Sequence, residues 1–326
     1  MRWLRWNVNA IGIGRKRVAG VETGVWCVQL FVDRKLPKAR IGAEHRIPTS
    51  VAGLPTDVVE SPRARLADAP RRPSPRVRTR RKARATAVLA GTAAGDPRVE
   101  TRPVTPGCSI GHVQSTTGTL GAFCTLGTDP KIRALGNCHV LADFGDARPE
   151  DEVVQPGPAH RVGSGGFVAR VDHFRRLVRS PGTVNRVDLA LARMRATVPT
   201  DPAIPGIGRI TGTLTPTPDL AVRKRGCMSG LTHGKIVSME WRGGLSVGSS
   251  GATIVYPFER QLRIDAVAPS ERFAVGGDSG SLVVTEDGPV RAVGLLCAAA
   301  IDGSFGIASP IDAVLDPAIG FAIKFL

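Results

Sequence analysis

The sequence predicts a mainly β protein built from two or three units. Its 326 residues exceed the length of one small domain, which is usually about 100 to 200 residues. Hydrophobic residues make up 42% of the chain, enough to bury a core, whereas aromatic residues make up only 5%. The 25 prolines help to divide the apolar stretches into short runs, and these runs are rich in valine and alanine. Such runs favour strands over long helices.

The first unit is expected at residues 1–61. Residues 8–13 and 25–32 are apolar runs with glycine-containing turns between them. Residues 58–59 are two valines that follow the turn sequence Gly-Leu-Pro-Thr-Asp. Because turn residues bound each run, we expect three strands. The unit is therefore predicted to be a small β or α/β unit, and inhibition, substrate docking and assembly are alternative roles for it.

A basic linker rich in proline and arginine is expected at residues 62–104. Within residues 62–86, ten arginines and lysines accompany one acid, a net charge of +9. The formal charge of the chain is +16, so the rest carries only 16 − 9 = +7. With few large apolar side chains to bury, this stretch is predicted to be disordered. Contact with an acidic partner or a nucleic acid is one role for it, and a solvated tether is another.

The largest unit is expected at residues 105–326. Apolar runs at 118–124 and 132–135 flank a Gly-Thr-Asp-Pro turn and predict a hairpin. A stretch rich in proline and threonine at 198–219 then predicts a crossing to a second half.

One motif in that second half indicates chemistry: Gly-Asp-Ser-Gly-Ser at residues 277–281, which precedes an apolar run. A serine hydroxyl is a poor nucleophile unless a base removes its proton and donors stabilise the resulting oxyanion. The flanking glycines allow a tight turn that uncovers Ser279 and aims the N–H groups of Gly277 and Ser279 at one point. An ordinary glycine-serine turn between two strands is the alternative interpretation.

The motif resembles the nucleophile segment of the trypsin/chymotrypsin-like serine peptidases, in which a histidine and then an aspartate precede the serine. Leu-Gly-Asn-Cys-His-Val-Leu-Ala at 135–142 resembles the histidine segment of that family. Val-Asn-Arg-Val-Asp-Leu-Ala-Leu-Ala at 184–192 resembles its aspartate segment. The spacings, 188 − 139 = 49 and 279 − 188 = 91 residues, suit a first barrel carrying His139 and Asp188 and a second carrying Ser279.

This resemblance implies a two-barrel chymotrypsin-like fold for the largest unit. Barrel one is expected at about 105–197, barrel two at about 220–308 and a C-terminal helix at about 310–316. Barrel two should include strands near 223–236 and 254–267. Short proline-containing pieces of the N-terminal unit, such as Arg-Lys-Leu-Pro, resemble the N-terminal segments of bacterial trypsin-like proteins.

The resemblance also implies a serine endopeptidase that acts on a protein or peptide and uses no cofactor. Ser279 would attack the carbonyl carbon, His139 would transfer the proton and Asp188 would orient the imidazole. The N–H groups of Gly277 and Ser279 would hold the oxyanion, each donor typically contributing about 3 kcal/mol.

The same resemblance locates the pocket that binds the residue before the cleaved bond. Phe273 would form its floor, the stretch from Cys297 through Ala298 to Ala299 would form a wall, and Gly306 would lie opposite. Because none of these residues pairs with a cation, we expect a small or medium apolar residue before the cleaved bond, and no self-cleavage in the arginine-rich linker. Cys297 stands where many relatives have a serine bonded to the catalytic aspartate, and Ala299 replaces a glycine that pairs with substrate.

Two other functions remain open. One is a catalytically silent binding protein that recruits a partner through the N-terminal unit and the linker. The other is a different serine hydrolase such as an esterase, although the motif is not Gly-x-Ser-x-Gly and the order of the acid and the serine differs. The rival acids and the other histidines match no family segment: Asp143, Asp146, Asp172, His45, His112, His160, His173 and His233.

The cysteines and the N-terminal residues bear on the compartment. The six cysteines, none in a CxxC pair, are Cys27, Cys108, Cys124, Cys138, Cys227 and Cys297. A disulfide framework would most readily join Cys124 to Cys138, but the start of the sequence lacks an apolar signal region, so we expect free thiols and a cytoplasmic protein. A zinc site combining Cys108 and His112 with His139 lacks a CxxC or HxxxH pattern, so no metal is predicted. We also expect no membrane span, and the sequence leaves the oligomeric state open.

Overall fold

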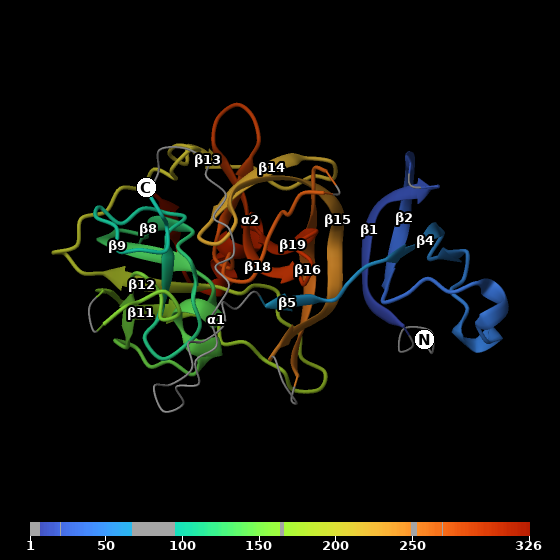
Figure 1. The fold of residues 1–326 in the computed structure, drawn as a ribbon, viewed down its shortest axis with the longest axis horizontal. Coiled ribbons are helices and arrows are strands. Elements are labelled where there is room, and N and C mark those ends of the chain that lie inside the picture. The colour runs from blue at the N-terminus through green and yellow to red at the C-terminus, as the bar shows by residue number, and fades with distance from the viewer. Residues whose placement is uncertain (1–6, 20, 67–94, 164–165, 249–252, 269) are drawn as a thin grey trace, which may run out of the picture.

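The computed structural model describes residues 7–326 apart from 20, 67–94, 164–165, 249–252 and 269. In this part of the chain, the strands form one sheet of twelve strands and one of eight (Figure 1). None of its helices is long and apolar enough to cross a membrane.

The eight-stranded sheet forms the first barrel. Its strand order is β20-β8-β9-β12-β11-β10-β6-β7. The strands are β6 (Ser109–His112), β7 (Gly118–Thr119), β8 (Ala122–Leu126), β9 (Asp129–Gly136), β10 (Glu152–Val154), β11 (Phe167–Phe174), β12 (Ala190–Met194) and β20 (Ile323–Phe325). The expected hairpin is present as β8 and β9, but the run 118–124 is interrupted at Leu120 and Gly121. Helix α1 (Cys138–Leu141) and a 3-10 turn (Asp143–Gly145) follow β9.

The second barrel belongs to the twelve-stranded sheet and completes the expected chymotrypsin-like two-barrel fold. Its strands are β13 (Gly212–Thr213), β14 (Ala221–Gly226), β15 (Gly230–Val247), β16 (Ile254–Ala266), β17 (Leu282–Thr285), β18 (Arg291–Ala300) and β19 (Phe305–Pro310). Helix α2 (Ile311–Leu315) and a 3-10 turn (Pro317–Ile319) come next, and β20 then returns the chain to the first barrel.

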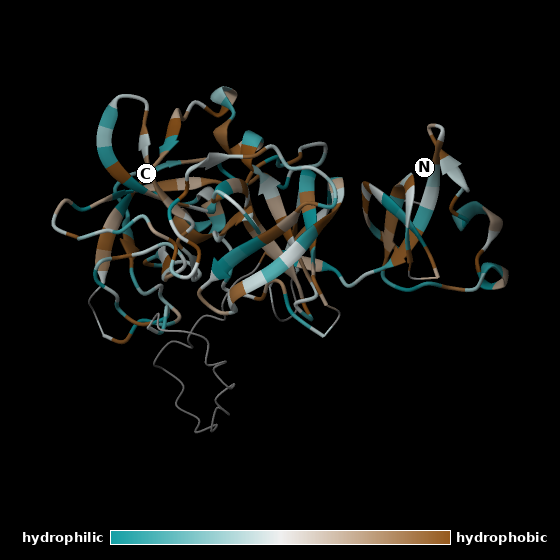
Figure 2. Cartoon of the chain, turned by 90° about the horizontal axis from the view of Figure 1, so that it is seen from above, coloured by the Kyte–Doolittle hydropathy of each residue, from teal (hydrophilic) through white to brown (hydrophobic). Residues whose placement is uncertain are grey.

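The N-terminal unit extends the sheet of the second barrel. It contains β1 (Val8–Val18), β2 (Val21–Val32), β3 (Ser50–Val51), β4 (Leu54–Glu60) and 3-10 turns at Lys38–Arg40 and Ala43–His45. β1 pairs antiparallel with both β2 and β15, whereas β2 and β4 are parallel. Figures 1 and 2 both show this unit at one end of the molecule. The Arg263 guanidinium ties the unit to the barrel, because it lies 4.5 Å from the ring centre of Phe31 and 3.8 Å from that of Phe305.

Residues 64–66 correct one part of the sequence prediction. The composition of the surrounding segment placed them in a disordered linker, but they form strand β5 (Ala64–Leu66). Ala64 and Leu66 are buried and Arg65 is exposed, so this short alternation buries apolar side chains in spite of its arginine. Residues 67–94, which include most of the predicted basic contact surface, lie outside the described residues.

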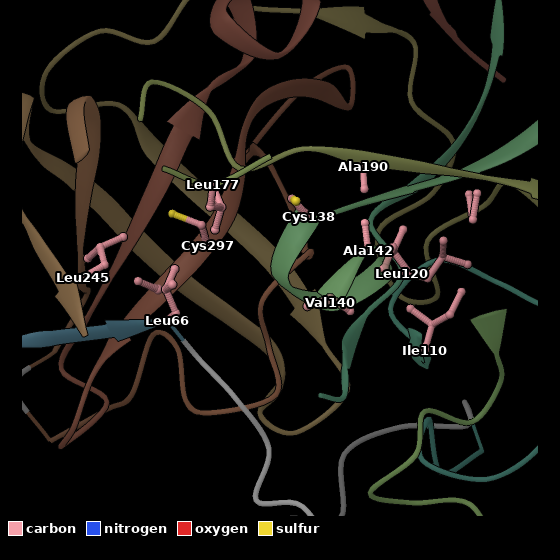
Figure 3. Packing of buried hydrophobic residues seen from close by; sticks show 14 of the residues in the cluster. Leu66, Ile110, Leu120, Cys138, Val140, Ala142, Leu177, Ala190, Leu245 and Cys297 are labelled. Carbon is pink, nitrogen blue, oxygen red and sulfur yellow. The ribbon is translucent and has the colours of Figure 1, made fainter. Parts of the chain in front are cut away.

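The largest apolar cluster runs from one barrel into the other. It joins Ile110 and Leu120 of the first barrel, through Val140 of α1, to Leu245 and Cys297 of the second (Figure 3). Close packing across this boundary fixes α1, and with it the histidine segment, against the second barrel.

Candidate active site

His139 lies where the chain leaves β9 and turns into α1. Asn137 is the residue before the helix, and its side-chain amide donates to the backbone carbonyl of Asp188 at 2.8 Å. The carbonyl of His139 accepts from the hydroxyl of Thr116 at 3.2 Å. The end of β9 is therefore followed by a helical turn, which the Thr116 hydroxyl and the bond from Asn137 to the Asp188 backbone hold in place.

Asp188 is paired with His139. Its Oδ2 lies 2.5 Å from the imidazole Nδ1, and its Oδ1 accepts from the N–H groups of Cys138 at 2.7 Å and His139 at 3.3 Å. Both side chains are fully buried. A carboxylate that accepts at Nδ1 keeps the proton of the neutral ring on that nitrogen, so Nε2 carries the lone pair that a general base needs.

The rival acids have other partners. Asp143 accepts from the hydroxyl of Ser115 at 2.6 Å, Asp146 pairs with Arg176 and Asp172 lies 2.6 Å from Arg133. Four of the other histidines also contact groups away from this site: His112 contacts Asp151, His160 contacts Ser109, His173 contacts Asp172 and His233 contacts Glu286. His45 contacts Glu44 within the N-terminal unit.

Ser279 lies on a turn that only glycine permits at two positions. Gly277 and Gly280 have φ angles of +99° and +97°, in the left-handed region. A Cβ on Gly280 would lie 2.2 Å from the carbonyl oxygen of Thr119. The prediction that this turn uncovers Ser279 is wrong for the full chain, because Ser279 is buried. Its hydroxyl donates to the carbonyl of Cys297 at 2.9 Å, and its carbonyl accepts from the N–H of Thr119 at 2.7 Å.

The turn that carries Ser279 and helix α1, which carries His139, meet at β7. A Cβ on Gly118 would lie 2.6 Å from the carbonyl oxygen of Ser279 and 2.5 Å from the side chain of Val140, which follows His139. The bare backbone of Gly118 thus lets the turn of barrel two approach α1 of barrel one. Ser279 and His139 come from these adjoining segments, and Asp188 joins them through its contact with His139.

The peptide groups of the turn are fixed from both sides. The carbonyl of Gly277 accepts from the hydroxyl of Thr119 at 2.9 Å and from the thiol of Cys227 at 3.2 Å. Within the turn, the N–H of Asp278 donates to the carbonyl of Val275 at 3.0 Å. A turn held this firmly can present backbone donors without reorganising.

Lys224 is the functional candidate that sequence reasoning missed. Its ammonium lies 3.1 Å from Oδ2 of Asp278 and 2.5 Å from the hydroxyl of Ser229, and both members of the ion pair are fully buried. The Asp278 carboxylate also accepts the N–H groups of Met228, Ser229 and Val275. Burial lowers the pKa of Lys224, and the charge of Asp278 opposes that shift. The one sequence signal for it is its position in the stretch 223–236, which was expected to contribute a strand of the second barrel.

The predicted pocket residues divide into two groups. The ring of Phe273 lies between two glycines, since a Cβ on Gly234 or Gly306 would lie 2.6 Å or 3.0 Å from its ring atoms. Phe273 and Ala299 belong to one apolar cluster of the second barrel. Cys297 takes a different orientation: its thiol donates to the carbonyl of Ile307 at 3.4 Å and lies 4.0 Å from the amide oxygen of Gln261.

The family resemblance predicts a serine bonded to the aspartate at the position of Cys297, but the Cys297 thiol has other contacts here. Ser309 lies nearer: its hydroxyl accepts from the N–H of Asp188 at 3.4 Å and donates to Gln261 at 3.0 Å. Ser309 does not cap α2, where no side-chain cap is present.

The thiols are free and buried, and the described residues contain no group of three or more metal-ligating side chains. Burial raises the pKa of Cys27 to about 11 and that of Cys108 and Cys124 to about 12. These thiols are therefore protonated at neutral pH and are poor nucleophiles.

No family model and no curated protein matches the chain. Among solved structures, Protease A of Thermobifida fusca is 15% identical with a TM-score of 0.45, over 68% of this chain and 100% of that chain. A chymotrypsin of Cellulomonas bogoriensis is 15% identical with a TM-score of 0.43, over 68% and 98%. The alpha-lytic protease homolog N4 is 20% identical with a TM-score of 0.43, over 67% and 97%. At these identities the similarity concerns the fold alone.

Proposed function

We propose that the chain is a serine endopeptidase that uses His139, Asp188 and Ser279. The observation that carries this proposal is the buried pair of His139 and Asp188 on segments that adjoin a serine in a glycine-bounded turn. A histidine that is only structural needs no carboxylate at Nδ1 together with two backbone donors on that same carboxylate.

The reaction proceeds through an acyl-enzyme. Ser279 Oγ attacks the peptide carbonyl carbon while His139 Nε2 takes the hydroxyl proton, and Asp188 stabilises the resulting imidazolium. The N–H groups of Gly277 and Ser279 receive the oxyanion. Collapse breaks the C–N bond, and His139 returns the proton to the leaving amine. Water then attacks the ester with His139 again acting as base, which releases the acid and restores the serine.

The substrate residue before the cleaved bond is proposed to be small or medium and apolar. Phe273 with Gly306, Ala298 and Ala299 supplies apolar surface, and no carboxylate is present in this set. An arginine or lysine side chain there would lose its hydration without gaining a partner.

Labelling with a fluorophosphonate probe tests the proposal. The wild-type chain should be labelled at Ser279, and both Ser279→Ala and His139→Ala should abolish that labelling, because loss of either residue typically lowers turnover about a million-fold. His233→Ala is the matched control, since this histidine pairs with Glu286 elsewhere. Cleavage of a peptide library should then show the apolar preference. If a folded chain resists labelling both as wild type and after a substitution that exposes Ser279, the catalytically silent binding protein is favoured.

A further inference from the structure

The edge of β18 beside the proposed catalytic centre is occupied by β5. The three antiparallel pairs join Ala64 to Ala300, Arg65 to Ala299 and Leu66 to Ala298. Cys297 directly precedes this stretch of β18, and its carbonyl accepts the hydrogen bond from Ser279. A segment expected in a linker thus pairs with the strand next to the nucleophile.

The direction of β5 is that of the acyl half of a substrate. A peptide that added to this edge of β18 with its cleaved carbonyl at Ser279 would have its preceding residues extend along β18 away from Cys297. β5 has this polarity, because its chain approaches Cys297 as it passes from Ala64 to Leu66. The pairing also involves Ala299, the position at which the family resemblance predicts backbone contact with substrate.

Contacts on two sides hold β5 in place. Leu66 is 2% exposed and belongs to the same apolar cluster as Leu245 and Cys297 (Figure 3). On its other side, Arg65 pairs with Ser246 of β15, whose hydroxyl donates to the carbonyl of Ala64 at 3.5 Å. β5 therefore fills a position between two strands of the barrel.

Docking of the N-terminal unit keeps β5 close to this position. The chain enters β5 just after Ser61, whose hydroxyl accepts from Arg263 at 2.7 Å. β1 is paired with β15 at the same time. A ligand tethered at so short a distance has an effective concentration on the order of millimolar, so it competes strongly with a free peptide.

We propose that β5 is a built-in peptide ligand that occupies the acyl-side substrate groove and suppresses activity of the full chain toward other peptides. This inference rests on the proposed peptidase centre. The surface concerned is the β18 edge at residues 298–300, and its occupant is the chain's own segment 64–66. A substrate has to displace β5 before it can add to the same edge.

The test releases β5 in the full-length chain. Leu66→Glu puts a charge into the apolar cluster and should expel β5, and Arg65→Pro should do so by removing an N–H from a strand paired on both sides. Both variants should react with the fluorophosphonate probe roughly tenfold faster than wild type or more. Val21→Glu adds the same charge at a position of the N-terminal unit that is 69% exposed, so this variant should react like wild type.

Hydrogen exchange makes the test independent of catalysis. The backbone amides of residues 297–300 should exchange faster in Leu66→Glu and Arg65→Pro than in Val21→Glu. Equal exchange and equal labelling in all three folded variants would overturn the inference while leaving the peptidase proposal intact. If no variant is labelled, the peptidase proposal fails, and the exchange rates alone decide whether β5 occupies the groove. Thermal unfolding of each variant identifies one that has not folded.

Discussion

The buried ion pair behind the nucleophile gives a quantitative prediction. In Lys224→Met the side chain keeps its length but loses its charge, so the buried Asp278 carboxylate is left without its counter-charge. Removing one partner of such a pair usually costs about 3 to 5 kcal/mol. Three backbone N–H groups still bind this carboxylate, so we expect a loss near the lower end, about 3 kcal/mol in the free energy of unfolding.

Denaturant unfolding of the full chain measures this loss, and Lys235→Met is the matched control. Lys235 also pairs with an acid, Asp219 at 2.8 Å, but its side chain is 39% exposed. Exposed pairs contribute about 0 to 1 kcal/mol, so the control should be nearly as stable as wild type. The double variant Lys224→Met/Asp278→Asn should recover part of the stability lost in Lys224→Met, because neither charge is then left unpaired.

Loss of this ion pair should also lower the peptidase activity. Asp278 lies between Gly277 and Ser279, so a shift of its side chain moves the proposed oxyanion donors, and we expect turnover to fall more than KM rises. A Lys224→Met chain that loses less than about 1 kcal/mol, like the Lys235→Met control, would refute the reasoning that this pair holds the turn.

Two further predictions concern the triad and the thiols. Asp188→Asn should fold but lower turnover about ten-thousandfold, because an amide favours the wrong imidazole tautomer; an unchanged peptidase rate would show that this acid does not act on His139. For the buried thiols Cys108 and Cys124, burial raises the pKa from 9.0 to about 12. Between these values only the unfolded chain loses the protons, so the free energy of unfolding should fall with rising pH, by up to about 1.4 kcal/mol per pH unit for each thiol. Urea titrations at pH 8 to 11 should show a shallower fall in Cys124→Ala, and equal slopes would contradict the argument.

The elements predicted best from the sequence were those with their own local signal. Glycines around Ser279 require a turn, and an apolar strand that begins two residues after Asp188 gives that acid a fixed place just before β12. Segments of this kind can be recognised without knowing their neighbours, because steric and hydrophobic constraints act over a few residues. The resemblance of these segments to those of the trypsin/chymotrypsin-like peptidases then implied the two-barrel fold and the pairing of Asp188 with His139.

The contacts that sequence reasoning missed depend on partners far along the chain. Lys224 looks like its charged neighbours Arg223 and Arg225, and only the fold brings it to Asp278, 54 residues later. Burial of such a lysine is unfavourable unless a partner is present, so no local pattern reports it. The orientation of the Cys297 thiol toward Ile307 is likewise a property of the packed barrel.

β5 shows why composition over a window is a poor guide to a docking strand. The stretch 62–86 averages to a charged, disordered segment, yet two apolar side chains on either side of Arg65 suffice for docking when both neighbouring strands are already in place. The entropy cost of ordering three residues is small beside that of building a strand pair from the unfolded chain. A linker with a polar residue in place of Leu66 would leave the β18 edge open, so a single apolar residue in this charged segment sets whether the groove is filled.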